Sequence, residues 1–131
     1  MGKLTPEMKE ILDRQLTFVA TSDKSGIPNV GPKGSTMVVD DNTLAYSEST
    51  GEKTLRNLEQ NPHISVLIFD YEKKEGYQFK GTTELVKEGS LFETISERQN
   101  KRKRPPPKVV VKITLTDIYT FKTGFPSTSV T

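Results

Sequence analysis

Extended stretches joined by very short turns make up the first third of this sequence. The stretches at residues 17–21 and 27–39 are separated by the turn 22–26, and the turn 40–42 leads into residues 43–47. Parallel neighbours in a sheet need a crossover of a dozen or more residues, so turns this short join antiparallel strands. The sequence therefore predicts an antiparallel sheet and argues against a doubly wound parallel one.

Three more extended stretches follow, at residues 64–69, 76–86 and 108–121. They are rich in Val, Ile, Thr, Tyr and Phe, the residue types that strands favour. Because residues 64–69 are almost all apolar, we expect this strand to be the most buried in the chain. Six strands in a chain of this length suit a small antiparallel barrel, which pairs its own edges.

Three short helices are expected around these strands. Thr5 is a hydroxyl cap for a helix within residues 1–16, and a second helix should span residues 52–60. Ser90 and Glu93 have the spacing of a capping box, which predicts the start of the third helix. The apolar stripe of the first helix is formed by Met8, Ile11, Leu12 and Leu16.

The length of 131 residues predicts one domain, residues 1–131, because two domains would each bury little apolar surface. Residues 122–131 are expected to form a polar tail anchored only by Phe125. No apolar run reaches 18 residues, which argues against a membrane span. The N-terminus lacks the apolar core of a signal peptide, so a cytoplasmic protein is expected.

The counts of reactive residues exclude several kinds of site. The chain has no Cys and one His, which excludes disulfides, Cys-ligated zinc, iron–sulfur clusters and thiol catalysis. His63 follows Asn61 and Pro62, where we expect it to be exposed. No set of acids has the pattern of a metal site, so none is predicted, and no catalytic residue is identified. A bound cofactor would have to supply any redox or transfer chemistry.

Hydroxyl, glycine and lysine residues are concentrated where residues 47–54 lead into the second helix. Free N–H groups at a helix start and the helix dipole favour an anion there, and Lys53 and Thr54 add a cation and a hydroxyl. A Walker A loop is not matched, because only Gly51 precedes the Lys-Thr pair. The pattern is compatible with a phosphate site and also with an ordinary capped helix that carries a surface lysine.

A second concentration interrupts the stretch 27–39, where Pro32 and Gly34 weaken regular strand pairing. Glycine in a strand marks the close approach of a ligand, or a bulge at a barrel corner, and both interpretations stay open. A third group of similar composition is found at residues 78–81 and includes Lys80. Strand register decides whether Lys33 or Lys80 faces a ligand.

Basic residues are clustered between the third helix and the last strand. The stretch 98–108 contains no acid and holds six of the 19 basic residues, against 17 acidic residues in the whole chain. One interpretation is a solvated helix end whose charges interact with the helix dipole. The other is a patch for an anion or a nucleic acid. The absence of interleaved aromatic residues argues against the nucleic acid.

The order of these segments resembles the flavin-binding split-barrel family, the pyridoxamine 5'-phosphate oxidase-like superfamily. The resemblance covers roughly residues 16–121 and is closest to the small FMN-binding and flavin-reductase-like members. Each motif is loose alone, but their order and spacing together are specific. The motifs are FVAT at 18–21, GIPNV at 26–30, PKGS at 32–35, LAYS at 44–47, KTLRNL at 53–58, NPHISVL at 61–67 and GYQFKGTTEL at 76–85.

The resemblance implies a six-stranded antiparallel Greek-key split β-barrel with three short helices, and a homodimer with FMN at its interface. Lys53 and Thr54 would hold the phosphate, and Ser47 would add a hydroxyl contact. The isoalloxazine and ribityl would lie along the segment formed by Lys33, Gly34, Ser35 and Thr36.

The same resemblance argues against a true pyridoxamine 5'-phosphate oxidase. The arginine and lysine that those oxidases carry on the second strand correspond to Gly31 and Thr36 here, and the chain has no Trp. The leading hypothesis is a flavoprotein that transfers electrons or hydride, with its donor and acceptor unidentified. The alternatives are a non-enzymatic flavin-binding or redox-sensing module, a deazaflavin-dependent reductase and, more weakly, a nucleic-acid-binding barrel.

Overall fold

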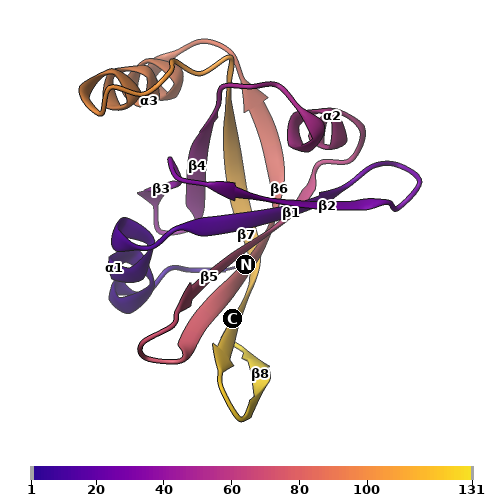
Figure 1. The fold of residues 1–131 in the computed structure, drawn as a ribbon, viewed down its shortest axis with the longest axis vertical. Coiled ribbons are helices and arrows are strands. Elements are labelled where there is room, and N and C mark those ends of the chain that lie inside the picture. The colour runs from indigo at the N-terminus through magenta and orange to yellow at the C-terminus, as the bar shows by residue number, and fades with distance from the viewer. Residues whose placement is uncertain (1, 131) are drawn as a thin grey trace.

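One antiparallel sheet and three helices make up the computed structural model, which describes residues 2–130 (Figure 1). Within these residues the strands follow the order β2-β1-β5-β6-β7-β4-β3, and β8 pairs with β7. The elements in chain order are α1 (Pro6–Arg14), β1 (Thr17–Ser22), β2 (Pro28–Lys33), β3 (Met37–Asp40), β4 (Thr43–Glu48), α2 (Lys53–Gln60), β5 (His63–Asp70), β6 (Glu75–Val86), α3 (Ser90–Lys101), β7 (Val109–Lys122) and β8 (Phe125–Ser129).

The expected fold class, mainly β and antiparallel with three helices, is confirmed, but the described residues hold eight strands rather than six. The stretch expected at 27–39 is divided into β2 and β3, because residues 34–36 leave the strand conformation. The other additional strand, β8, lies in the expected tail. Phe125 does not anchor that tail, since its side chain is 66% exposed; backbone pairing with β7 holds β8 in place.

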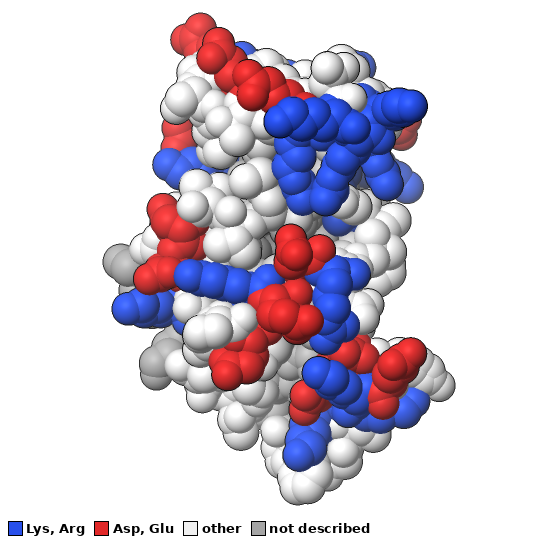
Figure 2. Space-filling view, turned by 90° about the vertical axis from the view of Figure 1, so that its left-hand side faces the viewer, with Lys and Arg blue, Asp and Glu red and all other residues white. Residues whose placement is uncertain are grey.

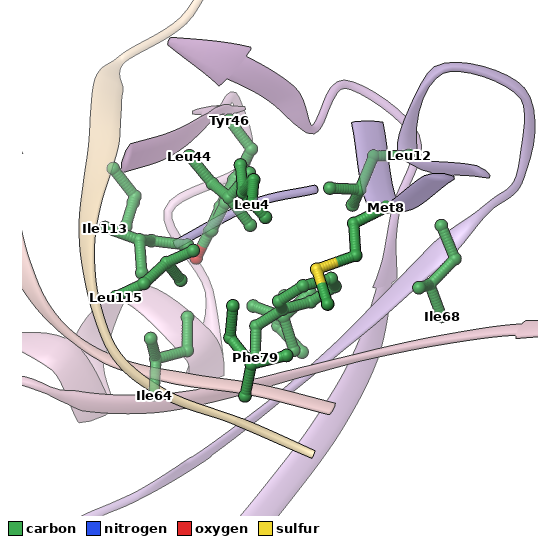
Figure 3. Close-up of a cluster of buried hydrophobic side chains, with 14 of the residues drawn as sticks. Leu4, Met8, Leu12, Leu44, Tyr46, Ile64, Ile68, Phe79, Ile113 and Leu115 are labelled. Carbon is green, nitrogen blue, oxygen red and sulfur yellow. The ribbon is translucent and has the colours of Figure 1, made fainter. Parts of the chain in front are cut away.

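The sheet curls around a core that α1 covers at one side (Figure 3). Met8, Ile11 and Leu12 of α1 are buried as predicted, whereas Leu16 follows the end of the helix and is 47% exposed. Thr5 caps α1 as predicted, because its side chain accepts a hydrogen bond from the Met8 N–H. The core is completed by Leu4, Val19, Leu44, Tyr46, Leu58, Ile64, Val66, Ile68, Phe79, Val111, Ile113, Leu115 and Ile118.

The most buried strand is β4 and not β5, which corrects the prediction for residues 64–69. Side chains of β5 alternate between the core and the outer surface, while every residue of β4 is buried. The outer side of β4 is covered by α3, where Ala45 packs in a second apolar cluster with Ile95 and Val110. Because α3 covers its outer side, β4 is buried on both faces, although Thr43, Ser47 and Glu48 in it are polar.

The helix starts differ in how they are capped. No side chain caps α3: its N-cap residue is Gly89, so the predicted capping role of Ser90 is wrong. The start of α2 also lacks a side-chain cap, because Glu52 makes no such hydrogen bond. None of the helices in residues 2–130 is long and apolar enough to cross a membrane.

Candidate functional site

Two of the three segments that the sequence singled out lie in contact. Ser35, in the turn between β2 and β3, accepts a hydrogen bond from the Ser47 N–H at 2.9 Å through its Oγ. The Thr36 hydroxyl lies 2.7 Å from the Thr17 hydroxyl. These side chains are buried, so their hydroxyls serve mainly to fix the turn. The exposed Gly34 is left at the surface of the turn, where a ligand can approach the backbone.

Lys33 is engaged by a carboxylate that the sequence analysis did not identify. Its Nζ lies 2.9 Å from Oε1 of Glu48, whose side chain is only 2% exposed. The other carboxylate oxygen accepts hydrogen bonds from the Thr50 hydroxyl at 3.2 Å and from the Gly51 N–H at 3.4 Å. Glu48 therefore connects the end of β2 to the loop that leads into α2. No local pattern in the sequence marks this acid, because only the fold brings it to Lys33.

The start of α2 has the features that a phosphate requires. The N–H groups of a first helical turn have no partner within the helix, and Glu52 supplies no side-chain cap here. Lys53 is exposed beside them. Thr54 is buried, and its hydroxyl accepts a hydrogen bond from the Asn29 side chain of β2 at 3.3 Å. Thr54 thus positions the helix start against β2, and Lys53 offers the accessible charge.

The third segment, residues 78–81, is bonded elsewhere. The Gln78 amide donates to Ser65 of β5 at 3.0 Å, and the Lys80 carbonyl accepts from the Thr116 hydroxyl at 3.2 Å. The Lys80 ammonium is exposed and lies 5.5 Å from the Tyr119 ring centre. The structure therefore brings the first two segments together, whereas the contacts of Lys80 are with Thr116 and Tyr119 of β7.

Tyr46 lies in the core beside this assembly. Its ring is fully buried, and among the described residues its hydroxyl has no hydrogen-bond partner. Burial, and secondarily the charge of Glu48, raises the pKa of the Tyr46 hydroxyl far above its ordinary value. Figure 3 shows Tyr46 among apolar side chains of the core. Tyr46 therefore remains a neutral phenol. Its ring packs beneath Lys33, whose ammonium lies 5.4 Å from the ring centre.

The basic stretch 98–108 contacts both the β2–β3 turn and the loop between β4 and α2. The Arg98 guanidinium donates a hydrogen bond to the Ser35 carbonyl oxygen at 2.7 Å. The Lys108 ammonium donates to the Thr50 carbonyl oxygen at 3.4 Å. The sequence showed that this stretch was basic, but its position beside the β2–β3 turn depends on the packing of α3 and could not be deduced locally.

His63 is exposed at the start of β5, as predicted. Within the part of the chain that the structure describes, no group of three or more His, Asp or Glu side chains is arranged to hold a metal ion.

Comparison with known proteins finds relatives that match nearly the whole length of this chain. The family model described as pyridoxamine 5'-phosphate oxidase matches residues 4–122. An uncharacterised protein of Methanocaldococcus jannaschii is 36% identical over 126 residues, covering 93% of this chain and 83% of that protein.

Solved structures show the same similarity in three dimensions. HupZ of Group A Streptococcus is 38% identical, with a TM-score of 0.87 over 92% of this chain and 96% of that one. An FMN-binding protein of Syntrophomonas wolfei is 18% identical, with a TM-score of 0.72 over 87% and 88% of the two chains. At that identity the similarity shows the fold alone.

Proposed function

The chain belongs to the pyridoxamine 5'-phosphate oxidase family, and from this premise we propose that it is an FMN-binding flavoprotein. The FMN phosphate binds at the start of α2, with Lys53 as its accessible cation. The isoalloxazine ring lies against the β2–β3 turn, where Gly34 presents backbone without a side chain. When bound, FMN supplies hydride or electron transfer, and the chain supplies binding and orientation.

The observation that carries this proposal is the hydrogen bond between Ser35 and Ser47, beside an uncapped helix start. This bond holds the turn that contains Gly34 next to the end of β4, and β4 leads to the start of α2. FMN consists of a flat ring and a phosphate, so it needs one surface for the ring, the turn, and a nearby site for the anion, the helix start. The FMN-binding protein of Syntrophomonas wolfei shows that a chain with this fold can bind FMN.

The outer surface of β1 and β5 supports a homodimer. Phe18 of β1 lies opposite Leu67 of β5, and both side chains point outward with about two fifths of their surface exposed (41% and 40%). Phe69 continues the same face and is 38% exposed. Contiguous apolar patches of this kind mark interaction surfaces. We place the second copy on this face, with FMN at the interface between the two copies.

Oxidation of pyridoxamine phosphate is not part of the proposed function. The two positions that correspond to the basic residues of true oxidases hold Gly31 and Thr36. Neither residue carries a charge that could bind a substrate phosphate. The Thr36 hydroxyl is also turned inward, to Thr17 and to the Lys33 carbonyl oxygen.

Replacing Lys53 with Ala tests the phosphate assignment. The Kd for FMN should rise about tenfold, because a charge-assisted contact to phosphate is lost. The Kd for riboflavin, which lacks the phosphate, should not change. Flavin fluorescence titrations of the full chain measure both constants, and circular dichroism verifies the fold. Lys87→Ala, another exposed lysine, is the matched control and should leave both constants unchanged.

Two results would contradict the assignment: unaltered protein that binds no FMN, or a Lys53→Ala variant whose FMN affinity equals that of the unaltered protein. Titration with a deazaflavin on the same samples identifies the preferred cofactor, and tighter binding of the deazaflavin would replace FMN in the proposal. Anaerobic mixing of the FMN form with NADH and NADPH then tests nicotinamide-linked reduction, which bleaches the flavin absorption band.

A further inference from the structure

Among residues 2–130, the ion pair between Lys33 and Glu48 is the one whose two side chains are both largely removed from water. They are 17% and 2% exposed, whereas at least one side chain of every other pair is 35% exposed or more. Figure 2 shows one side of the molecule, where Lys, Arg, Asp and Glu side chains lie at the surface. Water and salt screen charges at the surface, but they screen a buried pair much less.

The Glu48 carboxylate is held in place on the side away from Lys33. Its second oxygen accepts hydrogen bonds from the Thr50 hydroxyl and the Gly51 N–H. The backbone of the same residue is fixed as well, because its carbonyl oxygen accepts from the Lys108 N–H at 2.8 Å. Separating Lys33 from so buried a carboxylate would leave an uncompensated charge, which is costly. The pair is therefore retained when a ligand occupies the neighbouring surface.

The Lys33 ammonium is held at one position beside the proposed flavin surface. It donates to Glu48 at 2.9 Å and lies 5.4 Å from the ring centre of Tyr46, in the range of a cation–π contact. Lys33 directly precedes Gly34, whose backbone faces the isoalloxazine ring in the proposed function. A charge fixed next to that surface acts on the ring electrostatically, with or without direct contact.

The charge next to a flavin influences how readily the flavin is reduced. Reduction by two electrons and one proton adds one negative charge to the ring system. A nearby cation stabilises that charge and raises the midpoint potential, whereas a nearby carboxylate lowers it. Lys33 alone would raise the potential. An ammonium and a carboxylate 2.9 Å apart largely cancel each other at the longer distance of a neighbouring ring.

We propose that Glu48 is a positioning residue that compensates the charge of Lys33 and thereby keeps the midpoint potential of the bound flavin low. This inference rests on the proposed function, because it requires the isoalloxazine ring to lie beside Gly34. Lys33 then supplies a fixed N–H donor without a net charge, while the exposed Lys53 remains the cation for the phosphate. A low potential makes the reduced flavin a stronger electron donor to its acceptor.

Midpoint potentials of the FMN-loaded full chain test this role, measured by dithionite titration in the presence of a reference dye. Glu48→Gln should raise the potential, because it leaves Lys33 uncompensated. The affinity for reduced FMN relative to oxidised FMN should increase about tenfold, which for a two-electron couple corresponds to about 30 mV. Lys33→Met should lower the potential, because it leaves the charge of Glu48. The double variant should return close to the potential of the unaltered protein.

Glu59→Gln is the matched control. Glu59 is an exposed acid of α2 that makes no ion pair among residues 2–130. Its substitution removes the same charge as Glu48→Gln, and the potential should not change. Circular dichroism verifies the fold of each variant. Should Lys33→Met not fold, Glu48→Gln and the double variant still decide the question. Neither leaves a buried acid unpaired, and the potential of Glu48→Gln should be the higher of the two.

Opposite shifts that cancel in the double variant distinguish charge compensation from a merely structural role. Equal potentials in Glu48→Gln and the unaltered protein would overturn the role of Glu48. Shifts of the same sign in both single variants would overturn it too, because they would report a change of shape. In both cases FMN binding itself stands, since the unaltered protein still binds FMN in the fluorescence titration. Unaltered protein that takes up no FMN would instead overturn the proposed function, and this inference with it.

Discussion

Gly81 lies where the pairing of β6 with β7 shifts by one residue. Lys80 is opposite Asp117 and Gly81 is opposite Leu115, so Thr116 is an extra residue in β7. A Cβ atom at Gly81 would collide with the Thr114 carbonyl oxygen and lie 2.9 Å from Cγ2 of Ile113. Glycine is needed here because two backbones approach closely at a bulge, and not because a turn requires its conformational freedom.

Replacing Gly81 with Ala should therefore destabilise the fold. Overpacking a well-packed interior costs about 1–3 kcal/mol, and a collision with backbone places this variant at the upper end. Gly31→Ala is the matched control, because a Cβ there meets no atom within 4 Å. Urea denaturation measures the free energy of unfolding of both variants. Equal values for Gly81→Ala and Gly31→Ala would contradict the steric account.

At the scale of elements, the sequence predicted most helices and strands because their signals are local. The hydroxyl cap at Thr5 and the alternation in β7 depend only on neighbours in the chain. The burial of β4 was not predictable in the same way, because it depends on α3 covering the outer side of that strand. The hydrogen bond between Ser35 and Ser47 is likewise non-local. Both residues were predicted from the sequence as flavin contacts, but their contact with each other was not predictable.

The attachment of α1 to the end of β5 has a pH dependence that can be measured. The Asp70 carboxylate is almost fully buried and accepts a hydrogen bond from the Lys73 N–H at 3.1 Å. This N–H lowers the pKa of Asp70 most; burial acts in the opposite direction, and Arg14 of α1 lowers it further at 2.9 Å. A depressed folded-state pKa means that the carboxylate stabilises the fold above about pH 3.9, its ordinary value, and that this contribution is lost as pH falls further.

Asp70→Asn should accordingly melt at a lower temperature than the unaltered protein at neutral pH. The difference should shrink as the pH falls through the depressed pKa of Asp70. Thermal unfolding of both proteins over a pH series measures it. In an Arg14→Gln background the effect of Asp70→Asn should be smaller, because one of the groups that stabilise the carboxylate is already gone. A melting difference that is constant down to strongly acid pH would show that Asp70 acts only by packing.

At the scale of the whole molecule, the low apolar content of 32% and the outward apolar face of β1 and β5 have a common explanation. A small chain with few apolar residues has little surplus stability, and surface buried against a second copy adds to it. A ligand that binds only the folded state adds more, roughly 2.7 kcal/mol at a hundred times its Kd. Dimerisation and FMN binding should therefore be coupled, because the proposed cofactor lies at the interface.

Leu67→Lys tests that coupling, since it introduces a charge at the centre of the apolar face. Sedimentation should show a monomer, and the Kd for FMN should rise in the same variant. The melting temperature should also respond less to added FMN than that of the unaltered protein. Ile27→Lys is the matched control, because Ile27 is a 65% exposed apolar residue in the turn between β1 and β2. It should remain dimeric and retain its FMN affinity.

A Leu67→Lys monomer that binds FMN as tightly as the unaltered protein would place the cofactor within one chain. An unaltered protein that is monomeric with FMN bound would lead to the same conclusion, and the apolar face would then need a different partner.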